Sequence, residues 1–284
     1  MFAQNNLLKP FINIQNIEEI VNSLCKHKNL IVSKLKKDEL INKLLSYNVN
    51  NQPENKNIPR ENKKNNESLG LTFEKAICLK KEITYNGKFK YSETDALKLK
   101  DRLNNFNELC PHELIHTAKK GYKYDYESKD GKYKLSAKTN KNGYKVCPQV
   151  IGQTTKNKFC KYFKIPDNTN DNKIKEYIMN EHKKMLGEYF THTFDCDIIY
   201  YNQKTNILKF IKKENDINFD NFEYVFTKNI DEWIESSTIK INYNNSSYSL
   251  GEFQIHQHRN CIKFRWNFNT ILTVFKENFK ITDI

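Results

Sequence analysis

Residues 121–139, GYKYDYESKDGKYKLSAKT, alternate aromatic or apolar side chains with charged ones on both sides of Asp130-Gly131. This alternation has the period of two that a β-strand imposes on its side chains. Asp-Gly between two such runs is a strong signal for a two-residue hairpin turn. The segment therefore predicts a β-hairpin whose tight turn lies at residues 130–131.

The predicted turn also fixes which residues of the two strands face each other. Counting outward from it places Glu127 opposite Lys134 and Asp125 opposite Ser136. One face then collects the apolar and aromatic side chains: Tyr122, Tyr124, Tyr126, Tyr133, Leu135 and Ala137. The other face collects the charged and polar ones: Lys123, Asp125, Glu127, Lys134, Ser136 and Lys138. We expect the first face to pack on a core and the second to bring Asp125 near Lys138.

A carboxylate and an amine on one sheet face suit metal-dependent hydrolysis of phosphodiesters. Mg²⁺ prefers few carboxylates plus waters, and it stabilises the charge that builds on a phosphate. A nearby lysine can orient or deprotonate the attacking water. The alternative interpretation of the same pattern is a surface hairpin whose charges face water.

Asp125, followed on the next strand by Ser136-Ala137-Lys138, resembles the PD-(D/E)XK nuclease superfamily, which includes many type II restriction endonucleases. In that family an Asp begins one strand of a hairpin, an acid-x-Lys triplet lies on the next, and an earlier helix often supplies a Glu. The resemblance implies that Asp125 binds metal, that Lys138 is the catalytic lysine and that Glu74 is the helix Glu. It continues through 139–153 and covers roughly the central third to half of the chain.

The chain departs from the family pattern at Ser136, where an acid is usual. Relatives with Ser-x-Lys take the acid from a helix about a dozen residues later, but this chain has Gln149 and Gln153 there. The second metal ligand can come from three groups: Glu74, Glu127 or the backbone carbonyl of Ala137. Glu74 ranks first, against the alternative of an ordinary exposed helical Glu, and Gln153 is a weaker candidate for the site.

A competing motif is His112-Glu113-Leu114-Ile115-His116, which fits H-E-x-x-H. On a helix this spacing places two His on one face to bind Zn²⁺, with the Glu as general base. Pro111 is a natural first residue of a helix, so His112 and Glu113 would fall in its opening turn. A zinc metallohydrolase is therefore the third hypothesis, and a short helix packed against the hairpin is the structural alternative.

The C-terminal segment 250–268, LGEFQIHQHRNCIKFRWNF, predicts two strands joined near residues 258–260. Such a ribbon fits a DNA major groove, where Arg and Lys read guanine and Asn and Gln read adenine. The candidate DNA-contacting residues are Gln254, His256, His258, Arg259, Lys263, Arg265 and Asn267. The alternative is an ordinary amphipathic hairpin.

The rest of the chain organises into an arm, a linker and one larger domain. Helical spacing over 16–47 predicts an N-terminal helical arm at 1–47, and the polar stretch 48–66 predicts a linker or loop. Further helices are expected near 68–79, 93–107, 171–190 and 269–279, and strands within 194–227. Residues 67–284 are thus expected to form an α/β (α+β) nuclease domain. The resemblance implies a central mixed β-sheet flanked by helices.

Composition indicates a class of partner only through charge. The chain has 47 Lys+Arg against 34 Asp+Glu, a formal net charge of +13, which attracts polyanions such as nucleic acid. The seven Cys form no CxxC pair, and the N-terminus has no long apolar run. We therefore expect a cytoplasmic protein with reduced thiols and no membrane segment.

The sequence thus predicts a Mg²⁺-dependent, sequence-specific DNA endonuclease of the type II restriction class. Its expected partner is double-stranded DNA, and a homodimer is expected by analogy if the target is palindromic. The alternative is a nucleic-acid-binding module without catalysis.

Overall fold

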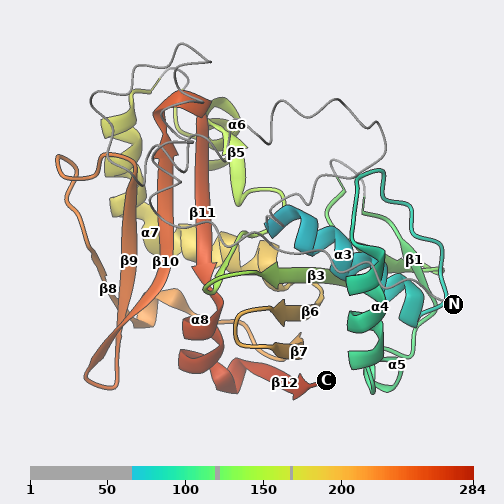
Figure 1. The fold of residues 1–284 in the computed structure, drawn as a ribbon. Coiled ribbons are helices and arrows are strands. Elements are labelled where there is room, and N and C mark those ends of the chain that lie inside the picture. Colours follow the sequence, from blue (N-terminus) through green and yellow to red (C-terminus); the bar gives the residue numbers. More distant parts are fainter. Residues whose placement is uncertain (1–65, 119–121, 167–168) are drawn as a thin grey trace, which may run out of the picture. The chain divides into compact units, whose positions relative to one another are not determined.

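The computed structural model describes residues 66–118, 122–166 and 169–284 (Figure 1). The chain divides into two units, residues 1–62 and 63–284, and the described residues all belong to the second. The helical arm predicted at 1–47 and residues 48–65 of the predicted linker therefore lie outside the described residues.

A first sheet of six strands carries the hairpin. Its order is β1 (Leu114–His116), β2 (Tyr126–Ser128), β3 (Lys134–Asn140), β6 (Asp197–Asn202), β7 (Ile207–Lys213) and β12 (Phe279–Asp283). β3 and β6 run parallel, whereas every other neighbouring pair is antiparallel, so the sheet is mixed. The mixed α/β class predicted from the sequence agrees with this arrangement.

A second, antiparallel sheet is built around the C-terminal strands. Its order is β4 (Lys145–Val146), β11 (Cys261–Asn267), β10 (Ser246–His256), β9 (Ser236–Tyr243) and β8 (Glu223–Phe226), and β5 (Gln153–Thr155) also pairs with β11. Both predicted C-terminal strands are confirmed. They form the middle of a sheet, however, and not the free two-stranded ribbon that a major groove admits.

The described residues also form six α-helices. They are α3 (Asn66–Lys80), α4 (Glu93–Arg102), α5 (Phe106–Leu109), α6 (Lys156–Phe163), α7 (Asp171–Phe194) and α8 (Phe268–Val274). Asn170 caps the N-terminus of α7, because its side chain accepts a hydrogen bond from the Lys173 N–H at 2.9 Å. Among the described residues, no helix is both long and apolar enough to cross a membrane.

Helix α7 shares one aromatic core with faces of both sheets. The Tyr189 ring stacks on Phe264 of β11 with 4.3 Å between centroids, and the Trp266 indole N–H donates to Thr193 Oγ1 at 3.0 Å. Both tryptophans, Trp233 and Trp266, are fully buried. Burying such large rings supplies much of the hydrophobic stabilisation in a chain rich in Lys and Asn.

Helix α3 covers the opposite face of the first sheet and fixes the position of Glu74. Phe73, Ala76 and Ile77 of this helix are fully buried against Leu135 and its neighbours. The Tyr126 hydroxyl of β2 donates to the backbone carbonyl of Glu74 at 2.8 Å. The helix is therefore held to the hairpin at the residue that the sequence proposed as a metal ligand.

The predicted register of the hairpin is confirmed, but its turn is wider than predicted. Tyr126 pairs with Leu135, and Glu127 pairs with Lys134. The chain turns over residues 128–131, where the Gly131 N–H donates to the Ser128 carbonyl, and Gly131 adopts a φ of +71°. The turn therefore includes Lys129 as well as the expected Asp-Gly pair.

Four other predictions differ from the structure, two of them in this region. The short helix expected at 112–116 is strand β1, because Leu114–His116 pairs with Ser128–Tyr126 of the hairpin. Tyr122, expected on the buried face, is 60% exposed, since β2 begins only at Tyr126. The predicted helix at 93–107 divides into α4 and α5, and the one at 269–279 ends at Val274 and is followed by β12.

Candidate active site

Asp125 and Lys138 lie together at the open end of the hairpin. The Lys138 ammonium is 3.8 Å from Asp125 Oδ2, and their side chains are 16% and 23% exposed. Because the pairing of β2 with β3 stops at Tyr126, the Ala137 N–H has no ladder partner in β2 and donates to Asp125 Oδ2 at 2.8 Å. The backbone of β3 therefore orients the carboxylate that its own lysine approaches.

Glu74 reaches the same place from α3. Burial raises the pKa of its carboxyl, a hydrogen bond from His116 opposes this, and the negative charge of Asp125 raises the pKa further. The positive charge of Lys138 also lowers it. The Glu74 carboxyl therefore lies within the electrostatic influence of Asp125 and Lys138, the other two residues that the sequence resemblance selected.

The oxygens of this cluster fit a hard divalent cation. Asp125 uses Oδ2 and Glu74 uses Oε2 for the bonds above, and in the described part of the chain their other carboxylate oxygens have no hydrogen-bond partner. Within that same part, no three His, Cys, Asp or Glu residues are grouped to hold a metal. Two carboxylates completed by waters are typical of Mg²⁺, whereas Ca²⁺ or Zn²⁺ usually has more protein ligands.

Ser136 points away from water and is bonded to Gln149. Ser136 is fully buried, and the Gln149 amide donates to its Oγ at 3.0 Å. Gln149 is 8% exposed, and its Oε1 has no partner in the described part of the chain. Burial raises the pKa of the neighbouring Cys196 to about 12, so that thiol stays protonated. A neutral Ser–Gln–Cys cluster thus occupies the position where the family pattern has an acid.

The structure separates two further candidates from this cluster. Gln153 is exposed in β5 and pairs with Lys263 in the second sheet, so Gln149 and not Gln153 is the glutamine beside the Ser-x-Lys strand. Glu127 lies 3.7 Å from the ammonium of Lys134, its partner across the hairpin. No hydrogen bond or ion pair between described residues joins Gln153 or Glu127 to Asp125.

The H-E-x-x-H motif does not form a zinc site. A strand replaces the helix that would align its two histidines. His112 is exposed and stacks on Tyr133 at 3.9 Å between ring centroids, and Glu113 pairs with Lys129 at 2.7 Å. His116 is 1% exposed and bonds to Glu74 at 3.2 Å. The zinc hypothesis is therefore wrong, and sequence spacing gave no signal for the contact between His116 and Glu74.

Two of the predicted DNA-contacting residues are held by the protein itself. Arg265 Nη2 bonds to Glu252, which also binds Lys145 Nζ at 3.0 Å. Asn267 caps α8, because its Oδ1 accepts from the Thr270 N–H at 3.4 Å. Arg265 and Asn267 are thus part of the second sheet's own framework.

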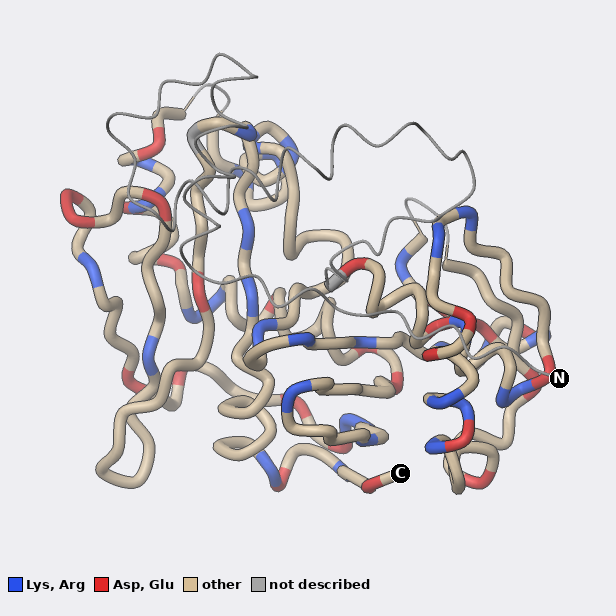
Figure 2. The backbone as a smooth tube through the Cα atoms, viewed as in Figure 1, with Lys and Arg blue, Asp and Glu red and all other residues tan. Residues whose placement is uncertain are grey.

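The remaining predicted contacts lie toward one end of the β10–β11 pair. Gln254 and Lys263 face each other across the two strands and are partly buried, and neither side chain forms a hydrogen bond or ion pair with another described residue. His256 ends β10, whereas His258 and Arg259 are exposed in the connecting turn at 257–259. Basic positions follow one another along β11, with an acidic position beside them on β10 (Figure 2).

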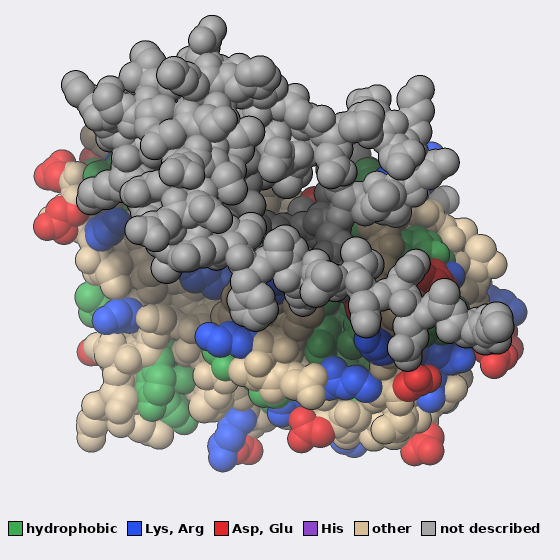
Figure 3. All heavy atoms as spheres, in the orientation of Figure 1, with side chains coloured by type: hydrophobic (Ala, Val, Ile, Leu, Met, Phe, Trp, Pro, Cys, Tyr) green, Lys and Arg blue, Asp and Glu red, His purple; other side chains and the backbone are tan. Residues whose placement is uncertain are grey.

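This basic strand lies beside the Asp125–Lys138 cluster. Burial raises the pKa of Cys147, while the positive charges of Lys263, Arg265 and Lys138 each act to lower it. The charges of three cations, from both sheets, therefore act on one thiol. In the space-filling view, Lys and Arg side chains are spread over the described surface on this side, with fewer acidic ones among them (Figure 3).

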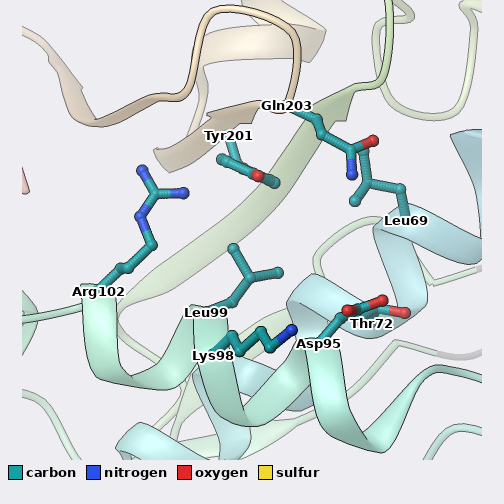
Figure 4. Close-up of a pocket in the computed structure, with 8 residues that line it drawn as sticks. All are labelled: Leu69, Thr72, Asp95, Lys98, Leu99, Arg102, Tyr201 and Gln203. Carbon is teal, nitrogen blue, oxygen red and sulfur yellow. The ribbon is translucent and has the colours of Figure 1, made fainter.

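A separate small pocket lies between α3, α4 and the end of β6 (Figure 4). Its volume is ≈ 150 Å³. The Arg102 guanidinium lies 5.2 Å from the Tyr201 ring centroid and donates to the Asn206 carbonyl at 2.9 Å. None of the predicted site residues lines this pocket.

Comparisons with known proteins point to one functional class. No protein-family model matches the chain, and no solved structure matches it. A type II restriction enzyme, CviAII of Paramecium bursaria Chlorella virus 1, is 43% identical to it over 219 residues. The match covers 76% of this chain and 62% of that enzyme, so the chain spans less than two thirds of its relative's length. Over most of its sequence, the chain is similar to a type II restriction enzyme.

Proposed function

We propose that this protein is a Mg²⁺-dependent endonuclease that cleaves double-stranded DNA at a specific short sequence. The observation that carries the proposal is the 3.8 Å approach of Lys138 to Asp125, with Glu74 beside them. The similarity to a type II restriction enzyme supports the same activity, since it is independent of this geometry.

In this proposal Asp125 and Glu74 hold the cation, with the Ala137 carbonyl as a further candidate ligand. Bound Mg²⁺ would neutralise charge on the scissile phosphate and lower the pKa of a bound water. Asp125 is fixed by the Ala137 N–H and so presents its free oxygen in one orientation. Lys138 orients the attacking water and donates to the charge that develops on the phosphate. Ser136 supports β3 through Gln149 and takes no direct part.

DNA would lie across the basic end of the second sheet. Gln254, Lys263, His256, His258 and Arg259 are the proposed contacts, since Arg265 and Asn267 are engaged within the protein. The neighbouring cations Lys263 and Lys138 would place that DNA next to the cleavage site. If the target is palindromic, a two-fold dimer is expected, because symmetric DNA favours a symmetric protein.

Incubation of supercoiled plasmid with the purified protein tests the proposal. Discrete fragments are expected with Mg²⁺, and none are expected with EDTA. Retarded but uncut plasmid under both conditions would instead establish a non-catalytic DNA-binding module. Cleavage that persists in EDTA would contradict the proposed role of the metal.

A further inference from the structure

We infer that His116 is a positioning residue that orients Glu74 for cation binding through a single tautomer of its ring. This inference rests on the proposed function, because it assigns Glu74 to the cation site. It gives the second histidine of the H-E-x-x-H motif a role that needs no zinc.

The first step is the tautomer of the ring. The backbone N–H of Asn86 donates to His116 Nδ1 at 3.0 Å, so Nδ1 acts as an acceptor and carries no proton. The single ring proton must then lie on Nε2, because the hydrogen bond at one imidazole nitrogen selects the tautomer of the other. Nε2 lies 3.2 Å from Glu74 Oε2 and therefore donates to it.

The second step is the rigidity of the ring. His116 is 1% exposed and stacks on Tyr85 at 4.8 Å between centroids, with Tyr126 at 5.2 Å. The Asn86 side chain also donates to the His116 backbone carbonyl at 2.8 Å. The His116 ring is thus held by aromatic contacts and by the backbone N–H and the side-chain amide of Asn86. These contacts restrict rotation of the Nε2–H donor that is directed at Glu74.

The third step is the consequence for Glu74. One oxygen of its carboxylate accepts the hydrogen bond from His116 Nε2–H, and the other has no hydrogen-bond partner among the described residues. A fixed donor on one oxygen restricts the orientation of the carboxylate and leaves the second oxygen free to bind a cation.

Two substitutions test the roles of the two ring nitrogens separately. The side-chain amide of His116→Gln reaches the position of Nε2 and keeps a donor for Glu74, but it gives up the contact with Asn86. The amide of His116→Asn reaches only the position of Nδ1, so it keeps an acceptor for Asn86 and loses the donor. Both lose the aromatic ring, so a purely structural role would affect them alike.

The experiment measures Mg²⁺ binding to the full-length chain by calorimetry without DNA, with melting temperatures as a check on folding. We expect His116→Asn to weaken Mg²⁺ binding about 10- to 100-fold and His116→Gln to stay within about threefold of the wild type. Equal losses in both variants, or no loss in His116→Asn, would overturn the inference. Nitrogen NMR of the metal-free protein gives an independent reading, and a proton on Nδ1 of His116 would also overturn it.

Glu74→Gln distinguishes failure of this inference from failure of the proposed site. If Glu74→Gln and His116→Gln behave as expected but His116→Asn binds Mg²⁺ normally, only the role of His116 is wrong. If Glu74→Gln binds Mg²⁺ as the wild type does, or the wild type binds none, the proposed cation site fails and the inference fails with it. His112→Ala is the matched control, because that histidine is exposed and does not contact Glu74.

Discussion

At the scale of single residues, buried polar groups in this protein hold charged neighbours in place. His116 is hydrogen-bonded to Glu74. In the second sheet, Glu252 binds both Arg265 and Lys145. Burial raises the pKa of Glu252, but the hydrogen bonds from Lys145 and Arg265 outweigh it, so the pKa is lowered overall. Its ionised form is therefore a source of stability.

We expect Glu252→Gln to lower the free energy of unfolding by about 1–3 kcal/mol at neutral pH, because two cations lose their shared counter-charge. The pKa of Glu252 is lower in the folded state than in the unfolded one, so this stability is present above about pH 4.5. It is lost as the pH falls through the lowered value.

Urea unfolding between pH 3 and pH 8 measures this effect. The difference between wild type and Glu252→Gln should be constant near neutral pH and shrink in acid. Glu277→Gln is the control, because Glu277 is 86% exposed and should change little at any pH. A difference that stays constant down to pH 3 would contradict the account of Glu252.

At the scale of elements, the hairpin positions Asp125 and Lys138, and α7 packs in the core that the two sheets share. The hairpin turn depends on Gly131, whose positive φ an L side chain adopts at a cost. Helix α7 runs for 24 residues between the two sheets and includes Gly187 in its interior. A Cβ atom added at either glycine would meet no atom within 4 Å, so backbone conformation alone decides the outcome.

The two glycines therefore make a matched pair of opposite sign. Gly131→Ala should destabilise the protein by about 1–2 kcal/mol because of its left-handed backbone. Gly187→Ala should stabilise it by about 0.5–1 kcal/mol, because alanine favours the helix. Thermal unfolding of both variants checks this, and a stabilising Gly131→Ala would mean that the turn differs from the one described.

Local patterns predicted the elements whose residues carry their own signal. Asp130-Gly131 and the flanking alternation were enough for the register that places Asp125 near Lys138. Strands β4 and β5 have two and three residues and exist because they pair with β11, so no local period predicts them. His116 lies 42 residues from Glu74, and its role follows from tertiary contacts that spacing alone does not encode.

At the scale of the whole molecule, the excess of positive charge matters where the two sheets meet. Lys138 belongs to the first sheet and Lys263 to the second, and both act on Cys147. We therefore expect one continuous DNA path from the proposed cleavage site to the end of the β10–β11 pair. The residues that we propose to line this path all belong to the unit at 63–284.

This path gives a prediction for Lys263→Met. If Lys263 reads a base, discrimination at one position of the target should fall by about 10- to 100-fold, whereas a phosphate contact would weaken all sequences alike and reduce the salt slope by about one. Selection from a random DNA pool with each protein separates the two. Lys280→Met, at an exposed position of β12, is the control. Unchanged binding by Lys263→Met would place the DNA elsewhere.

The most direct test compares Lys138→Ala with Lys134→Ala, two lysines of the same strand. Lys138 approaches Asp125, whereas Lys134 pairs with Glu127 across the hairpin. Single-turnover cleavage of plasmid DNA with saturating Mg²⁺ should slow by about 100-fold or more in Lys138→Ala and by no more than about threefold in Lys134→Ala. Equal rates in the two variants, with both proteins folded, would contradict the assignment of the site.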